Sequence, residues 1–166
     1  EMDDDVEEIE LLNKNTNNVC IDNFCETIHE SFDLVDYEGL FGFNANNNYF
    51  FSSCENQFGL YSIINSCCGY INDKSIILTC KEKEDFERTI LFYKKGKKIL
   101  KRGGYGIKTN YWKNKGGIQD HYDFEQRKVV QKESAIRLLE LYPNYCYKVE
   151  RKNGIVDIRF KRNPSV

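Results

Sequence analysis

The feature that most constrains the fold is a hairpin signal near the carboxyl end of the chain. Two stretches, residues 145–151 and 155–161, flank the sequence Lys152-Asn153-Gly154. An Asn-Gly pair tolerates the positive backbone angles of a tight turn, and such turns join antiparallel strands. The sequence therefore predicts at least one antiparallel strand pair.

Apolar residues at three-to-four spacing predict two helices. The first runs from about residue 20 to 34, and the second lies near Leu138 and ends at Pro143. A short acidic helix over residues 5–12 and a helical turn over 82–87 are also expected. The residues that carry the two main patterns are Ile21, Phe24, Cys25, Ile28 and Phe32 in the first helix, and Ala135, Leu138, Leu139 and Tyr142 in the second.

Other stretches are typical of strands and turns. The aromatic run 49–51 and the apolar runs 75–79 and 88–93 predict strands, and residues 44–48 form an asparagine-rich turn signal. Residues 94–117 are basic and rich in glycine, which favours an exposed loop with strand segments. Eleven phenylalanines and eleven tyrosines favour a core that contains a sheet. The sequence thus predicts an α+β fold, in which an antiparallel sheet is flanked by a few helices, and 166 residues suit a single domain.

The seven cysteines do not form a metal-binding pattern. Cys25 and His29 are four residues apart on the predicted helix and could join Cys20 as metal ligands, but a fourth ligand is missing. Reduced and mostly buried thiols are the expectation, together with no cofactor and a cytosolic or nuclear location. The amino-terminal residues do not resemble a signal peptide. No apolar run is long enough to predict a membrane span, so a membrane partner is not expected.

Charge is distributed unevenly along the chain. Residues 1–40 contain thirteen acidic residues and one base, Lys14, whereas residues 88–119 contain ten bases and no acid. A basic cluster of this kind predicts binding to a polyanion such as DNA. The alternative interpretation is that the two charged regions pair with each other.

One cluster of titratable residues could be catalytic. Asp120, His121, Asp123 and Glu125 could supply a general base, or could hold a metal ion beside a basic groove. The alternative is the polar face of an exposed strand. Because the chain offers no phosphate-binding loop, nucleophile elbow or pair of histidines on a helix, an enzyme is not the expectation.

Several motifs, read in order, resemble the DNA-binding domain of plant NAC transcription factors. That family has an aromatic Trp-Tyr-Phe-Phe-Ser run, a Gly-Tyr pair followed by Asp-Lys, and a strand leading into a basic turn. Here the corresponding segments are Asn48-Tyr49-Phe50-Phe51-Ser52, Gly69-Tyr70 with Asp73-Lys74, and residues 88–97. Weaker likenesses extend over residues 4–152.

The resemblance implies a nuclear, dimeric domain that binds duplex DNA through a basic sheet edge and loop. The family strand that enters the major groove is reduced here to Ile71-Asn72, which implies reduced sequence specificity, because base contacts specify and phosphate contacts position. The residues nearest the bases would be Asn72, Asp73 and Lys74, and the phosphate contacts would come from Arg88, Lys94, Lys95, Lys97, Lys98, Lys101, Arg102 and Lys108.

Two other classes of function remain open. The chain could be a protein-interaction module, either a degenerate family member that dimerises without reading DNA or an unrelated immunity-type binding protein. In that case the acidic helices would bind a basic partner, and the location would be cytoplasmic. A metal-dependent nuclease that uses the cluster at residues 120–125 is the third class.

Overall fold

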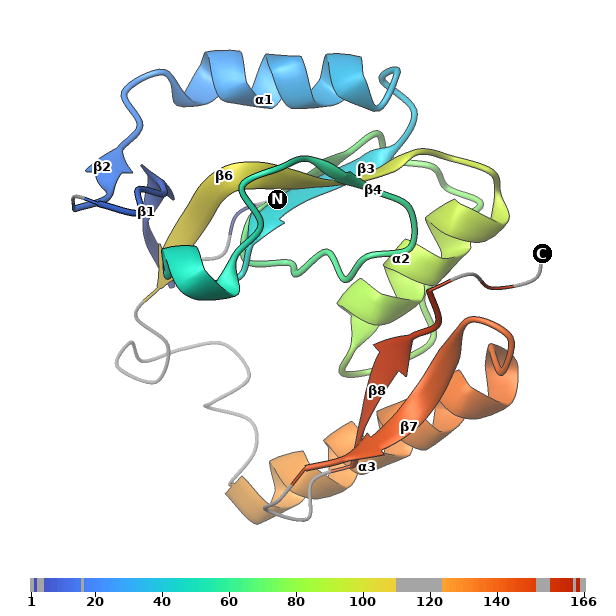
Figure 1. Cartoon of the computed structure of the whole chain (residues 1–166). Helices are drawn as coiled ribbons and strands as arrows, with labels where there is room; N and C mark the ends of the chain where they lie inside the picture. Colours follow the sequence, from blue (N-terminus) through green and yellow to red (C-terminus); the bar gives the residue numbers. More distant parts are fainter. Residues whose placement is uncertain are drawn as a thin grey trace.

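The computed structural model describes residues 2, 5–15, 17–109, 124–151, 156–162 and 164 (Figure 1). Within these residues the chain has the predicted α+β fold, in which helices flank a mostly antiparallel sheet. The elements in chain order are β1 (Val6–Leu11), β2 (Val19–Cys20), α1 (Phe24–Leu34), β3 (Leu40–Asn44), the 3-10 helix η1 (Tyr49–Phe51), β4 (Gln57–Phe58), β5 (Cys68–Tyr70), α2 (Glu84–Lys94), β6 (Ile99–Thr109), α3 (Phe124–Leu141), β7 (Cys146–Glu150) and β8 (Val156–Phe160).

The larger sheet is built around β6. Its strand order is β2-β1-β6-β3-β5, and β4 also pairs with β6. β6 runs antiparallel to β1 and β4 and parallel to β3. At Gly103, β6 passes so close to a neighbouring loop that a Cβ atom would lie 2.1 Å from the carbonyl carbon of Glu55. The next residue, Gly104, has a φ of +75°. These two positions therefore require glycine.

The helices cover both faces of this sheet. α1 packs on one face, where the ring of Phe32 meets that of Phe41 edge to face at 4.9 Å. α2 packs on the other face, where Phe92 lies against Leu40 and Ile99.

A second core lies on the far side of α2, between that helix and α3 with the hairpin of β7 and β8 (Figure 1). Ile90, Leu138 and Ile158 are almost completely buried there. Helix α2 is therefore enclosed by two cores.

The structure confirms three of the local predictions. The hairpin forms with Cys146 opposite Phe160 and Glu150 opposite Val156, although its turn residues lie outside the described part. The two predicted helices are α1 and α3, and Ala135 and Leu138 are buried as expected.

Four local predictions are wrong. Residues 5–12 contain the strand β1 instead of a helix, because the long strand β6 pairs with them along most of their length. Residues 88–93 belong to α2 instead of a strand, because a helix places Ile90 in one core and Phe92 in the other. Residues 49–51 form η1, which the Asn48 side chain caps by accepting from the Phe50 N–H, and residues 75–79 form no strand.

The basic segment also differs from its prediction. Residues 99–109 are the central strand of the sheet instead of an exposed loop, and residues 110–117 lie outside the described part. No helix among the described residues has the length and apolar character needed to cross a membrane.

Candidate nucleic-acid interface

The acidic and basic regions of the chain pair with each other in the fold. Glu38 pairs with Lys97, and Asp36 lies 2.6 Å from Lys98. Further along β6, Glu30 pairs with Arg102 at 3.0 Å, and Lys108 lies 3.2 Å from Glu8 and 3.8 Å from Glu7. The alternative interpretation of the charge distribution is therefore confirmed for these residues. Much of the basic segment is neutralised within the molecule.

Two of the predicted phosphate contacts lie inside the protein. The Arg88 guanidinium stands 4.7 Å from the centre of the Tyr70 ring and donates a hydrogen bond to Asn65 Oδ1. The Arg102 side chain is 8% exposed and stacks on Tyr105. Because both guanidiniums are held by aromatic rings and polar partners, their placement corrects the prediction that they face DNA.

The loop after β5 holds the residues predicted to lie nearest the bases. Asn72 and Lys74 are exposed there. The Asp73 carboxylate accepts hydrogen bonds from the Ser75 hydroxyl and N–H and pairs with Lys95 at 3.0 Å. The bonds from Ser75 and then Lys95 hold the pKa of Asp73 well below its usual range. Asp73 is thus engaged within the protein.

The carboxyl end of α2 and the residue after β8 contact the same turn. The Lys94 ammonium stands 5.3 Å from the centre of the Tyr142 ring, and Tyr93 packs against Tyr145 at 6.1 Å. Lys161, just after β8, donates to the Pro143 carbonyl at 2.8 Å. All these contacts meet at the turn between α3 and β7.

We call the resulting surface the lysine-rich end, and it consists of Lys74, Lys94, Lys95, Lys97, Lys98, Lys161 and Arg162. The sequence reasoning missed Lys161 and Arg162. The sequence feature that could have indicated them is the presence of three basic residues in the segment Arg159-Phe160-Lys161-Arg162. Only the tertiary structure places Lys161 and Lys94 at the same turn.

Lys101 differs from the other predicted phosphate contacts. It lies half-buried on β6 and forms no ion pair with any described residue. Burial lowers the pKa of its ammonium. The pKa of Lys108, by contrast, is raised by its hydrogen bond to Glu8.

The predicted catalytic cluster is mostly outside the described residues. Asp120, His121 and Asp123 fall there, and Glu125, in the first turn of α3, lies 2.8 Å from Lys128. Cys20 and Cys25 are exposed and form no disulfide. Across the described ranges, no group of three or more histidine, cysteine, aspartate or glutamate side chains is placed to hold a metal ion.

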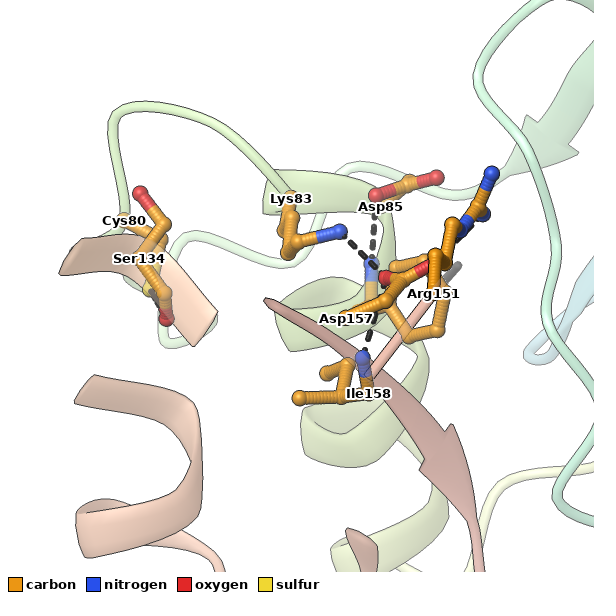
Figure 2. Close-up of polar contacts among 8 residues, drawn as sticks. Cys80, Lys83, Asp85, Ser134, Arg151, Asp157 and Ile158 are labelled. Carbon is orange, nitrogen blue, oxygen red and sulfur yellow. Dashed lines mark hydrogen bonds and ion pairs between the residues drawn. The ribbon is translucent and has the colours of Figure 1, made fainter. Parts of the chain in front are cut away.

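Polar contacts also join α2 to the hairpin (Figure 2). Lys83, which precedes α2 with a φ of +63°, lies 2.7 Å from Asp157 of β8, and Arg151 pairs with the same carboxylate. Near them, burial raises the pKa of Asp85 to about 6. These contacts hold the second core against α2.

No protein-family model matches the sequence, and the searches of curated proteins and of solved structures gave no match either. The resemblance to NAC domains stays a prediction.

Proposed function

We propose that this domain binds duplex DNA, with low sequence preference and without catalysis, through the lysine-rich end. The observation that carries the proposal is that Lys94 and Lys161, which are distant in the sequence, both contact the turn between α3 and β7. Clustered lysine and arginine side chains are the usual footprint of phosphate binding.

The local charge balance supports this proposal. Seven cations form the lysine-rich end, and the carboxylates paired with them are Asp36, Glu38 and Asp73. These pairs are partly exposed, and exposed pairs contribute only about 0–1 kcal/mol each. DNA phosphates could therefore replace the carboxylates at low salt. The lysines also complement the negative end of the α2 dipole, which is their role if no DNA binds.

Low sequence preference follows from the residues near the loop after β5. Base edges are read by hydrogen bonds in the grooves. Of the three residues predicted to lie nearest the bases, Asp73 is already engaged with Ser75 and Lys95, which leaves the exposed side chains of Asn72 and Lys74. A domain of this kind would act as a transcription regulator in the nucleus only together with a partner or a second copy that adds specificity.

The test is a titration of a fluorescent duplex of random sequence at several salt concentrations. Lys94→Gln with Lys161→Gln removes two cations from the lysine-rich end. We expect the affinity to fall about 3- to 10-fold near 50 mM salt, and the slope of log K against log salt to lose about 2 units. The matched control is Lys14→Gln with Lys132→Gln, which removes two exposed cations from elsewhere. The control should change affinity less than about 2-fold.

Two outcomes would contradict the proposal. The first is that the wild-type protein does not bind DNA even at low salt. The second is that both double variants weaken binding equally, since binding would then reflect net charge and not this surface.

A protein-interaction module is the second candidate function, and η1 favours it. Phe50 and Phe51 are 77% and 80% exposed, and aromatic side chains of this kind often carry the energy of protein interfaces. If they form a dimer contact, sedimentation of the wild-type protein will show a dimer. The double variant Phe50→Ser with Phe51→Ser will then be a monomer. If the wild-type protein is itself a monomer, η1 does not form a dimer contact.

A further inference from the structure

Lys101 is placed on a defined face of the central strand. In the sheet it lies between Gly42 of β3 and Gln57 of β4. Successive residues of a strand point to opposite faces. Lys101 therefore shares the face of Ile99, which packs toward α2, and not the face of Leu100, which packs under α1.

The ammonium group of Lys101 lacks the partners that neighbouring cations have. Lys95, Lys97, Lys98, Arg102 and Lys108 each pair with a carboxylate, and Lys94 lies over an aromatic ring. Lys101 has neither kind of partner among the described residues, although it is half-buried. Partial removal of a charge from water is unfavourable unless a counter-ion compensates for it.

Gln57 supplies a second group beside this cation. It is the direct cross-strand neighbour of Lys101, and such neighbours have Cβ atoms about 5 Å apart on the same face. Gln57 is also half-buried, and its side-chain amide forms no hydrogen bond within the described part of the chain. A side-chain amide has two donor hydrogens, which suit an oxyanion.

We propose that Lys101 and Gln57 form a binding site for a phosphate group. The ammonium would supply the charge, and the Gln57 amide would donate to a second phosphate oxygen. Because both residues are partly exposed, a phosphate group can reach them from solution. The phosphate could belong to a small molecule or to a nucleic-acid backbone. This site does not depend on the lysine-rich end.

The experiment follows the side-chain amide signals of Gln57 by NMR during a titration with inorganic phosphate at constant ionic strength. We expect these signals to shift in a saturable manner in the wild-type protein. They should not shift in Lys101→Met, which keeps the length of the side chain and removes the charge. Lys148→Met is the matched control, because it removes a lysine that already has a carboxylate partner, Glu150, and that lies outside the lysine-rich end, and the shift should persist there.

Thermal unfolding gives a second readout. Phosphate stabilises most proteins slightly by exclusion from their surface, so the three proteins should share a small rise in Tm. Specific binding adds a further rise of about 2 °C or more in the wild type and in Lys148→Met, but not in Lys101→Met. The proposal would be overturned by an equal rise in Tm in all three proteins together with Gln57 amide signals that shift without saturating. That result would mean that the Lys101 ammonium is solvated by water and binds no phosphate.

A parallel titration with a short duplex identifies the source of the phosphate. If the duplex shifts the Gln57 signals, the site binds the DNA backbone. If inorganic phosphate shifts them and the duplex does not, the site belongs to a small molecule. The result with inorganic phosphate is independent of DNA binding at the lysine-rich end, so the two proposals can fail separately.

Discussion

Nη2 of Arg102 lies 3.0 Å from Oε2 of Glu30, and this pair joins the centre of β6 to α1. The guanidinium is 8% exposed, whereas the carboxylate is 62% exposed. The charge of the arginine is therefore the one that is mostly removed from water. Its attraction to the glutamate, which comes from the acidic region of the chain, offsets the free-energy cost of that desolvation.

Glu30→Gln should destabilise the protein by about 1–2 kcal/mol, because it leaves a buried guanidinium without a carboxylate. Glu38→Gln is the matched comparison, since it removes the same charge from a pair whose lysine is 31% exposed. That change should cost less than about 0.5 kcal/mol. Urea denaturation at neutral pH measures both free energies of unfolding. Equal losses would show that burial of the cation does not decide the energy of these pairs.

Glu87→Gln should cost about 2–4 kcal/mol. The Glu87 carboxylate is fully buried and accepts from the Thr79 N–H at 2.6 Å, the Cys80 N–H at 2.9 Å, the Thr79 hydroxyl at 2.8 Å and the Tyr142 hydroxyl at 3.2 Å. An amide would place N–H groups against some of these donors. Glu84→Gln, in the same helical turn, is the control and should cost little, because among the described residues only the Asn65 side chain donates to that carboxylate.

The same contacts make the stability sensitive to acid. Burial alone would raise the pKa of Glu87, but the hydrogen bonds from Thr79, Cys80 and Tyr142 outweigh it, and the pKa lies below its usual value. The contribution of Glu87 is thus present above the unfolded pKa and is lost as the pH falls through the folded pKa. Denaturation curves should show that the difference in unfolding free energy between the wild type and Glu87→Gln is smaller in acid than at neutral pH. A constant difference from the wild type at all pH values would contradict this.

Asp85 should have the opposite pH dependence. Burial raises its pKa to about 6, from an ordinary value near 3.8. Between these two values the folded protein holds the proton more tightly, so stability falls as the pH rises through this window. Asp85→Asn should therefore stabilise the protein at pH 7 by about 1–2 kcal/mol and have little effect below about pH 4. A gain that is the same at both pH values would show that the charge is not the cause.

The cysteines should separate into two classes of reactivity. All seven are free, and Cys20, Cys25 and Cys54 are exposed. The other four are buried, and burial raises the pKa of Cys67, Cys80 and Cys146 to about 11 in each case. A thiol reagent at neutral pH should modify three cysteines rapidly and four only on unfolding, because the thiolate is the reactive form. Rapid modification of more than three would contradict the packing of the cores that bury the other four.

The sequence determined those elements whose signals are local. The hairpin of β7 and β8 follows from the turn residues at 152–154, and α1 and α3 follow from the spacing of their apolar residues. The charge distribution likewise offered a correct alternative, in which the two regions pair with each other. The hairpin and the two helices can be recognised without any residue from a distant part of the chain.

Only the tertiary structure decided the roles of β1, α2 and the basic residues. Residues 6–11 become a strand because β6 pairs with them, and residues 88–93 become helical because two cores enclose them. The Arg88 side chain is buried because it contacts Tyr70 and Asn65. The Arg102 side chain is buried because it contacts Tyr105 and Glu30. Lys94 and Lys161 both contact the turn between α3 and β7. The physical reason is the same in each case. Burial and charge pairing depend on neighbours that are distant in the sequence, and the free energy of those contacts exceeds the local preferences that a sequence displays.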